Sequence, residues 1–265
     1  MKRVLNIAVS LSLAIIIVIL YYYYRWKPLW SLEKPKAVYH VAHHQDDTLR
    51  IAMIGDSWVG MRTDTQNNLL QAKLSEKINR PVMVKTKGKG GEKSRGIYHL
   101  MFTYEGFGTK PLIEECPDYC VVIAGINDAA ANFGWKYHVY YMNLIINLLL
   151  GNGIRPILIE IPNVNIWSVY RKKPIKDLTM DYMRSLMTGC GMYHYSEYRE
   201  ALLLMLKDDN IIDSVLYVPM RKWNGDGVNL NRLLFMDDQI HLNKQGYMKM
   251  DSCIIMTIQK DLKIQ

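Results

Sequence analysis

Short apolar runs rich in β-branched residues alternate with longer stretches of helical hydrophobic spacing from residue 49 onward. This alternation is typical of βαβ units, in which each crossover returns the chain so that successive strands lie parallel. We expect the strands at residues 50–54, 82–86, 119–124, 156–161 and 214–218. Five strands with helical crossovers predict an α/β fold, a three-layer α/β/α sandwich around a five-stranded parallel sheet.

The intervening segments have lengths and patterns that predict helices. We expect these helices at residues 64–79, 93–104, 136–150, 177–206 and 244–262, the fourth broken near Gly189. With 265 residues, 49% of them hydrophobic, the chain is long enough for one sizeable globular domain.

The N-terminus carries an apolar segment between charged residues. Lys2 and Arg3 precede the apolar run of residues 4–20, and four tyrosines at 21–24 then lead into Arg25-Trp26-Lys27. The run is close to the roughly 20 residues that span a bilayer, and the aromatic and cationic residues suit its interface. A cleaved signal peptide is the alternative, which the bulky residues 21–26 disfavour because a cleavage site needs small side chains.

We therefore divide the chain into an uncleaved membrane anchor at residues 1–27, a juxtamembrane linker at 28–48 and a catalytic domain at 49–265. Positive charges flank the anchor on both sides, so the positive-inside rule does not decide its orientation. A short N-terminal tail with the domain on the extracytoplasmic side is the topology that we expect.

Histidines and cysteines raise the question of a metal. His40, His43 and His44 lie in the linker, but no further ligand stands at suitable spacing, so a linker is preferred. The cysteines at 116, 120, 190 and 253 fit no zinc pattern, and we expect buried free thiols. No metal and no organic cofactor is predicted.

The formal net charge of +8 is concentrated in two basic clusters, at residues 85–95 and 171–176. Such clusters can attract anionic glycans or lipid head groups, although charge runs are commonly just solvated surface. No nucleic-acid-binding motif accompanies them, so nucleic acid is not an expected partner. Aromatic residues between 163 and 198 indicate either a sugar-stacking surface or helix core packing.

Polar residues stand where the predicted strands end. Gly55-Asp56-Ser57 follows the first strand, glycines 88–91 follow the second, and Gly125-Ile-Asn127-Asp128 follows the third. The carboxyl ends of parallel strands share one edge of the sheet, which is where open α/β sheets bind ligands. Each motif alone is also consistent with an ordinary helix cap, but their joint occurrence favours an active site.

A serine needs a base and a stabilised oxyanion to act as a nucleophile. Asp238 and His241 lie three positions apart, so both side chains can project from one turn. Ser57 would attack an acyl carbonyl, His241 would take and return the proton, and Asp238 would orient the imidazole. The Ser57 amide, a glycine amide of the second loop and the side chain of Asn127 could form the oxyanion hole.

These four blocks, in this order, resemble those of the SGNH, or GDSL-type, hydrolases. The similarity covers residues 49–262, with the blocks at 55–57, 88–91, 125–128 and 238–243. It implies a flavodoxin-like α/β/α fold, a Ser57-His241-Asp238 triad and an oxyanion hole of Ser57, Gly88 and Asn127. No Gly-x-Ser-x-Gly nucleophile elbow is present, which disfavours the α/β-hydrolase alternative.

The function predicted is that of a membrane-anchored serine esterase that removes short acyl groups, acetyl included, from an acylated small molecule or a glycan. One alternative is an O-acyltransferase that passes the acyl group from the same serine to a sugar hydroxyl. The other is a glycan-binding protein without catalysis, because a fold does not guarantee chemistry.

Overall fold

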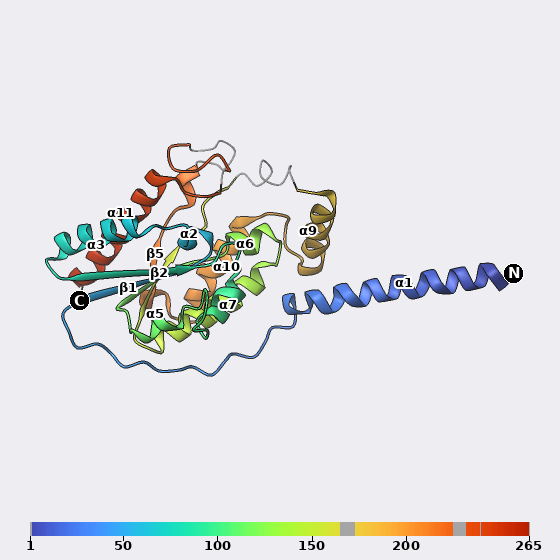
Figure 1. Cartoon of the computed structure of the whole chain (residues 1–265), viewed down its shortest axis with the longest axis horizontal. Helices are drawn as coiled ribbons and strands as arrows, with labels where there is room; N and C mark the ends of the chain where they lie inside the picture. Colours follow the sequence, from blue (N-terminus) through green and yellow to red (C-terminus); the bar gives the residue numbers. More distant parts are fainter. Residues whose placement is uncertain (1, 165–172, 225–231, 239, 265) are drawn as a thin grey trace. The chain divides into compact units, whose positions relative to one another are not determined.

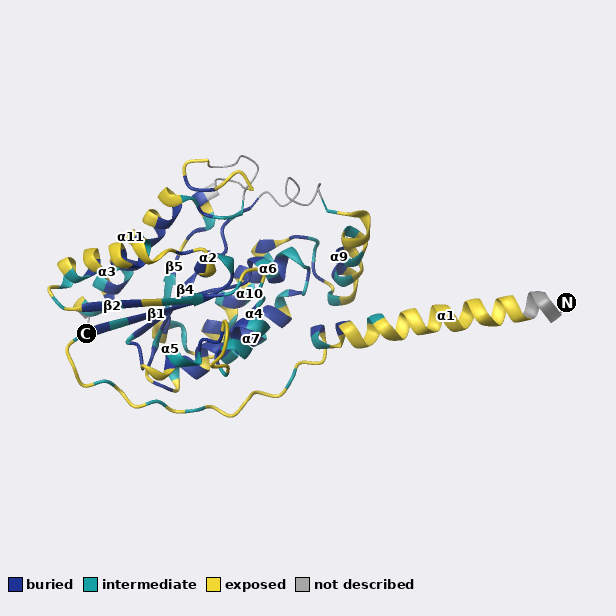
Figure 2. Cartoon of the chain, in the orientation of Figure 1, coloured by how far each residue is buried: buried dark blue, intermediate teal, exposed yellow. Residues whose placement is uncertain are grey.

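The computed structural model of the chain describes residues 2–164, 173–224, 232–238 and 240–264 (Figure 1). The chain divides into two compact units, residues 1–36 and residues 37–265. The first unit holds helix α1 (Lys2–Trp26) and the short 3-10 helix η1 (Lys27–Leu29). Within residues 6–29, the most apolar 18-residue stretch has a mean hydropathy of 2.2, and the segment is exposed along nearly its whole length (Figure 2). By length and composition this segment can cross a membrane, as a signal sequence also can.

The second unit is built on a parallel five-stranded sheet. Its strands are β1 (Leu49–Gly55), β2 (Val82–Gly88), β3 (Tyr119–Ile123), β4 (Arg155–Ile159) and β5 (Leu216–Val218). The strand order is β2-β1-β3-β4-β5, and all four neighbouring pairs are parallel. This is the flavodoxin-like order of a doubly wound sheet, in which the chain switches direction between β1 and β3.

Helices cover both faces of this sheet, which completes the predicted sandwich (Figure 1). The shorter helices are α2 (Ser57–Gly60), α4 (Ser94–Leu100), α5 (Lys110–Glu114) and α6 (Ile126–Ala130). The longer ones are α3 (Asp64–Ile78), α7 (Trp135–Leu150), α9 (Ile175–Thr188), α10 (Tyr195–Asp208) and α11 (Lys244–Ile264). Helices α3 and α11 pack together, as do α4, α7 and α10. Two further 3-10 helices, η2 (Ile212–Ser214) and η3 (Arg221–Asn224), flank β5.

The buried core explains why these segments become strands. Every residue of β3 is buried, and so are six of the seven residues of β1. Strands covered on both faces are almost continuously apolar, which is the pattern that the sequence displays. The predicted fold class is therefore confirmed, and the predicted break near Gly189 is the boundary between α9 and α10, where Gly189 has φ 68°.

The second half of the predicted linker packs as part of the larger unit. The Tyr39 hydroxyl donates to the carbonyl of Met101 at 2.7 Å. The amide of Val41 donates to Asn152 Oδ1 at 3.0 Å. Residues 37–48 form no regular helix or strand, so side-chain contacts of this kind hold them to the domain.

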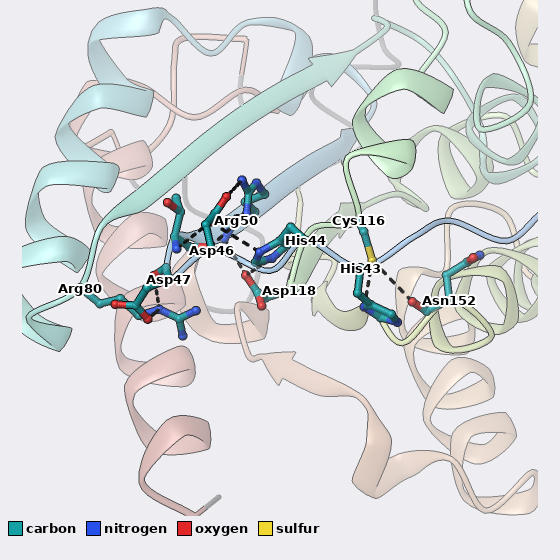
Figure 3. Close-up of polar contacts among 10 residues, drawn as sticks. His43, His44, Asp46, Asp47, Arg50, Arg80, Cys116, Asp118 and Asn152 are labelled. Atoms are coloured by element: carbon teal, nitrogen blue, oxygen red, sulfur yellow. Dashed lines mark hydrogen bonds and ion pairs between the residues drawn. The ribbon is translucent and has the colours of Figure 1, made fainter.

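The linker histidines take part in this attachment without forming a metal site (Figure 3). His43 Nδ1 lies 3.2 Å from the Cys116 sulfur, and His44 Nε2 lies 3.3 Å from Asp118 Oδ2. Cys116, Cys120 and Cys190 are buried free thiols, as predicted, whereas Cys253 is partly exposed. Within the described ranges, no group of three or more His, Cys, Asp or Glu side chains could hold a metal ion.

Candidate active site

The predicted site residues lie at the carboxyl edge of the sheet, where β1 and β3 end. Ser57 opens α2 directly after β1, and Asn127 lies in the first turn of α6 after β3. Gly125 has φ 111°, a left-handed conformation that favours glycine, and it turns the chain from β3 into α6. The site therefore occupies the switch point of the sheet, where ligands bind in folds of this kind.

Ser57, His241 and Asp238 form a continuous chain of two hydrogen bonds. His241 Nε2 lies 2.9 Å from Ser57 Oγ, and His241 Nδ1 lies 2.6 Å from Asp238 Oδ2. The backbone amides of Ile240 and His241 both donate to Asp238 Oδ1 at 2.9 Å, which fixes the carboxylate. An imidazole held in this way presents Nε2 as an acceptor for the serine proton.

The charge on Asp238 is stabilised by its neighbours. Partial burial raises the pKa of Asp238, but the bonds that the carboxyl accepts from the His241 ring and the two amides outweigh this effect. The pKa therefore lies below its usual value, and Asp238 is ionised at neutral pH. An ionised partner stabilises the imidazolium that forms when His241 takes a proton.

The Asn127 side chain reaches the same edge but is already engaged. Its Nδ2 donates to the carbonyl of Glu92 at 3.0 Å and approaches Asp56 Oδ2 at 3.3 Å. An incoming oxyanion would therefore have to compete with one of these two acceptors for an amide hydrogen. Asn127 stays a predicted oxyanion donor that is held in place by the two loops beside it.

The glycines of the second block differ in their surroundings. A Cβ on Gly88 would lie 2.6 Å from the Gly60 amide nitrogen and 2.7 Å from the Asp56 carbonyl, so Gly88 allows α2 to approach β2. A Cβ on Gly90 would lie 3.9 Å from Ser57 Cβ. The role predicted for Gly88 stays a prediction, and Gly90 is the glycine of this loop whose own Cβ position faces Ser57. The spacing Gly88-x-x-Gly91, which resembles that of the family, favours Gly88, whereas the surroundings of the loop place Gly90 nearer to Ser57.

Asp56 has a structural role next to the nucleophile. It is 1% exposed, and its Oδ1 accepts the Trp58 amide at 3.0 Å, which caps α2. Burial, helped by the nearby Asp128 carboxylate, raises the pKa of Asp56 to about 7. Asp128 is itself buried and accepts from the amide and hydroxyl of Ser94, so it ties α6 to α4.

Contacts of α2, and of the turn that follows it, with α11 hold the two ends of the site together, and the sequence alone did not reveal them. The fully buried Arg62 side chain donates to both oxygens of Asp251, at 2.8 and 3.2 Å. The Tyr247 hydroxyl donates to the carbonyl of Trp58 at 2.8 Å. Residues that are 189 positions apart in the sequence thus join the helix that bears Ser57 to the helix that follows His241.

The aromatic residues near the site mostly belong to the core. Trp58 is 2% exposed, and Tyr193, Tyr195 and Tyr198 are at most 7% exposed. Tyr182 is the exception at 53%, whereas Trp167 and Tyr170 lie outside the described residues. The three buried tyrosines therefore belong to the core, which is one of the two interpretations of this segment. They do not form a sugar-stacking surface.

Comparison with known proteins identifies the architecture. No protein-family model matches the chain, and no curated protein is similar to it in sequence. Among solved structures, the lipase/acylhydrolase from Enterococcus faecalis has a TM-score of 0.57 at 15% identity, covering 80% of this chain and 96% of that one. The psychrotrophic esterase EstA from Pseudoalteromonas sp. has a TM-score of 0.57 at 16% identity, covering 82% and 100%.

A GDSL-like lipase from Bacteroides thetaiotaomicron is also similar, with a TM-score of 0.54 at 16% identity over 80% of this chain and 89% of that one. Identities this low show a shared fold. Over about four-fifths of its length the chain has the fold of the GDSL-type lipases and acylhydrolases, with Ser57, His241 and Asp238 gathered at the carboxyl edge of its sheet.

Proposed function

We propose that this protein is a serine hydrolase of ester bonds. The observation that carries the proposal is the hydrogen-bonded chain from Ser57 Oγ through the His241 imidazole to the Asp238 carboxylate. The likeness to solved lipases, esterases and acylhydrolases supports it, because the same fold serves ester cleavage in those proteins. Ester hydrolysis with such a triad needs neither a metal nor an organic cofactor.

The reaction takes place in two steps. His241 Nε2 accepts the hydroxyl proton while Ser57 Oγ attacks the ester carbonyl, and His241 then protonates the leaving alkoxide as the acyl-serine forms. In the second step water attacks the acyl-serine and loses a proton to His241, which returns it to Ser57 Oγ as the bond to the acyl carbon breaks and the carboxylic acid leaves. The Ser57 amide, Asn127 Nδ2 and a glycine amide of the second block stabilise the oxyanion in both steps.

The acyl group that we propose is short, with acetyl as the simplest case. Asp56 and Trp58, the two sequence neighbours of Ser57, line a cavity of about 10 Å³ together with Ile123 and Ile161, and Ser57 itself is not part of the lining. A space of that size holds about one water molecule or a methyl group, so it does not admit a long chain. The short acyl group is therefore a proposal that the choice of substrates tests directly.

A glycan is the alcohol side that we propose. The second block stands in a basic loop, in which Lys89 is 42% exposed and pairs with Glu92, next to Lys87 and Lys93. Exposed cations of this kind favour a polar or anionic substrate. The tyrosines at 193, 195 and 198 are buried and cannot stack on a sugar. The support for a glycan substrate therefore comes from the basic residues.

The test is the substitution Ser57→Ala in the full-length protein, with Ser252→Ala as the matched control on the exposed side of α11. Hydrolysis of p-nitrophenyl acetate should fall at least about a thousandfold in the first variant and stay unchanged in the second. A fluorophosphonate probe should label the wild-type protein but not the Ser57→Ala variant. Retained turnover in Ser57→Ala would contradict the mechanism.

Product analysis separates hydrolysis from acyl transfer. Incubation with an acyl donor and an acceptor glycan should yield free carboxylic acid, whereas an acylated glycan would identify an acyltransferase. Comparing p-nitrophenyl acetate with octanoate tests the acyl size, and a preference for octanoate would refute the short-chain assignment.

We further propose that residues 1–27 remain in the mature protein as a membrane anchor with the domain on the extracytoplasmic side. The apolar α1 supports an anchor. Resistance to alkaline carbonate extraction tests membrane insertion, and protease accessibility in intact cells tests the side. Release of the protein by carbonate would refute the membrane anchor. Protection of the domain from protease in intact cells would refute the extracytoplasmic side.

A further inference from the structure

Helix α9 has its polar face turned inward and its apolar face turned outward. Asp181 and Ser185, on one side of the helix, are 1% and 9% exposed. Ile175, Tyr182 and Leu186, on the opposite side, are 82%, 53% and 60% exposed. A surface helix in water normally has the reverse arrangement, with apolar residues toward the core.

The inward face is held by polar contacts. Asp181 Oδ2 pairs with Lys173 Nζ at 2.6 Å and accepts from the Tyr193 hydroxyl at 2.9 Å, and its other oxygen pairs with Arg184. Arg184 Nε donates to the carbonyl of Ala131 at 2.6 Å, just after α6. The orientation of α9 is therefore fixed by a buried ionic cluster, and turning the helix over would leave Asp181 without these partners.

The outward face is continuous. Ile175, Thr179, Tyr182, Met183 and Leu186 recur at the three- and four-residue spacing that lines up along one side of a helix, and all of them except Thr179 are apolar. Within this row Met183 is 42% exposed, and Met187 beside the row is 43% exposed. Adjacent apolar side chains that remain in water at this density mark an interaction surface.

We propose that this outward face of α9 lies in the boundary between head groups and acyl chains of a lipid bilayer. An interfacial helix buries Leu, Met and aromatic side chains there and keeps basic residues at head-group level. Within α9, which is described in full, Lys176 is the charged residue on the exposed apolar side, and Asp177 points away from it. Tyr182 suits the same boundary because its ring is apolar and its hydroxyl polar.

The connecting chain between the two units is short. Seven residues, 30–36, join the last residue of η1 to the start of the second unit. Fully extended, they reach about 25 Å, so a membrane that holds α1 would lie within reach of the second unit. This step rests on the proposed anchor, whereas the inverted polarity of α9 does not.

A second copy of the chain fits this face less well. The helix has 14 residues. It is therefore about 21 Å long and about 10 Å wide, so two copies packed through it would bury roughly 400 Å² in total. Stable protein interfaces bury about 1,200 Å² or more.

The experiment places one fluorescent probe on each of two matched leucines in the full-length protein. Leu186 on α9 and Leu204 on α10 are 60% and 58% exposed. Each is replaced by cysteine in a Cys253→Ser background, because the other three cysteines are buried, and labelled with the fluorophore NBD. The proteins are reconstituted into phosphatidylcholine and phosphatidylglycerol vesicles that contain lipids spin-labelled on the acyl chain. Circular dichroism melting confirms that each variant is folded.

The probe at Leu186→Cys should show blue-shifted emission and quenching several-fold stronger than the probe at Leu204→Cys. Equal quenching at both positions, or none at either, would overturn the proposal. So would a probe at 186 that is shielded without lipid quenching, together with a disulfide between two chains in the unlabelled Leu186→Cys protein, because a second copy would then cover α9. Carbonate extraction of the same samples reports on α1 separately, so a failed anchor and a failed α9 contact give different results.

Discussion

Replacing Asp56 with asparagine should remove a pH dependence from the stability of the domain. The Asp56 carboxyl is 1% exposed, and burial raises its pKa to about 7, with the Asp128 carboxylate adding to the effect. In the unfolded chain the same group titrates near its ordinary value of about 3.9. The folded state thus binds a proton at Asp56 over a pH range in which the unfolded state has lost it.

The sign and size follow from this difference. Because the folded pKa is raised, the neutral acid favours folding, and its contribution is complete below about pH 3.9. Between that pH and about pH 7 the unfolded state binds fewer protons, so the free energy of unfolding falls as the pH rises. A difference of about three pKa units corresponds to roughly 4 kcal/mol, at 1.36 kcal/mol per unit. Asparagine cannot titrate, so the variant lacks this slope.

The assay is urea unfolding of the full-length protein in mild detergent, followed by near-ultraviolet circular dichroism between pH 4 and pH 8. The free energy of unfolding of the wild type minus that of Asp56→Asn should decline by several kcal/mol as the pH rises over this range. The difference should level off above about pH 7. Asp208→Asn, which changes an exposed acid at the end of α10, should leave the wild-type slope unchanged. A difference curve that is flat with pH would refute the reasoning, because Asp56 would then be ionised in the folded state.

Two further substitutions test the site and its support. Asp251→Ala should lower the free energy of unfolding by about 3–5 kcal/mol, because it leaves the buried Arg62 charge unpaired; a loss below about 1 kcal/mol in urea unfolding would contradict this. Asp238→Asn should lower kcat for p-nitrophenyl acetate by about a hundredfold or more, because His241 loses the ionised partner that orients it and stabilises its charge. The exposed neighbour provides the control: Asp237→Asn should retain activity, and equal losses in both variants would argue against the assigned orienting role.

The sequence was sufficient for the strands because burial on both faces of a parallel sheet leaves a recognisable apolar run. The prediction for the third strand, 119–124, differs by one residue from β3 (Tyr119–Ile123). The sequence did not predict helices α2, α5 and α6. These helices have four or five residues each and are too short to establish a helical period.

The candidate site could be predicted only as a set of residue types in order. Strand ends in a parallel sheet converge, so Ser57 and Asn127 were expected to meet, and they lie at the same edge. The orientation of side chains is a different matter, because the position of Gly90 beside Ser57 depends on how the loop folds after β2. The spacing in α9 likewise predicts an amphipathic helix, but only the partners of Asp181 determine which face is buried.

The distance between Ser57 and His241 depends on contacts made away from the reacting atoms. His241 lies on a short antiparallel bridge between Phe235 and Leu242, and its carbonyl accepts the Met236 amide at 2.7 Å. This bridge orients the loop, but α11 sets its distance from Ser57. Helix α11 follows the loop and is joined to α2 by the Tyr247 hydroxyl and to the turn after α2 by the Arg62 ion pair. A serine and a base contributed by opposite ends of the domain are thus held 2.9 Å apart by the packing of two helices. Because a base must lie within hydrogen-bond reach of its nucleophile to take the proton, this packing is as much a condition for the proposed reaction as the triad itself.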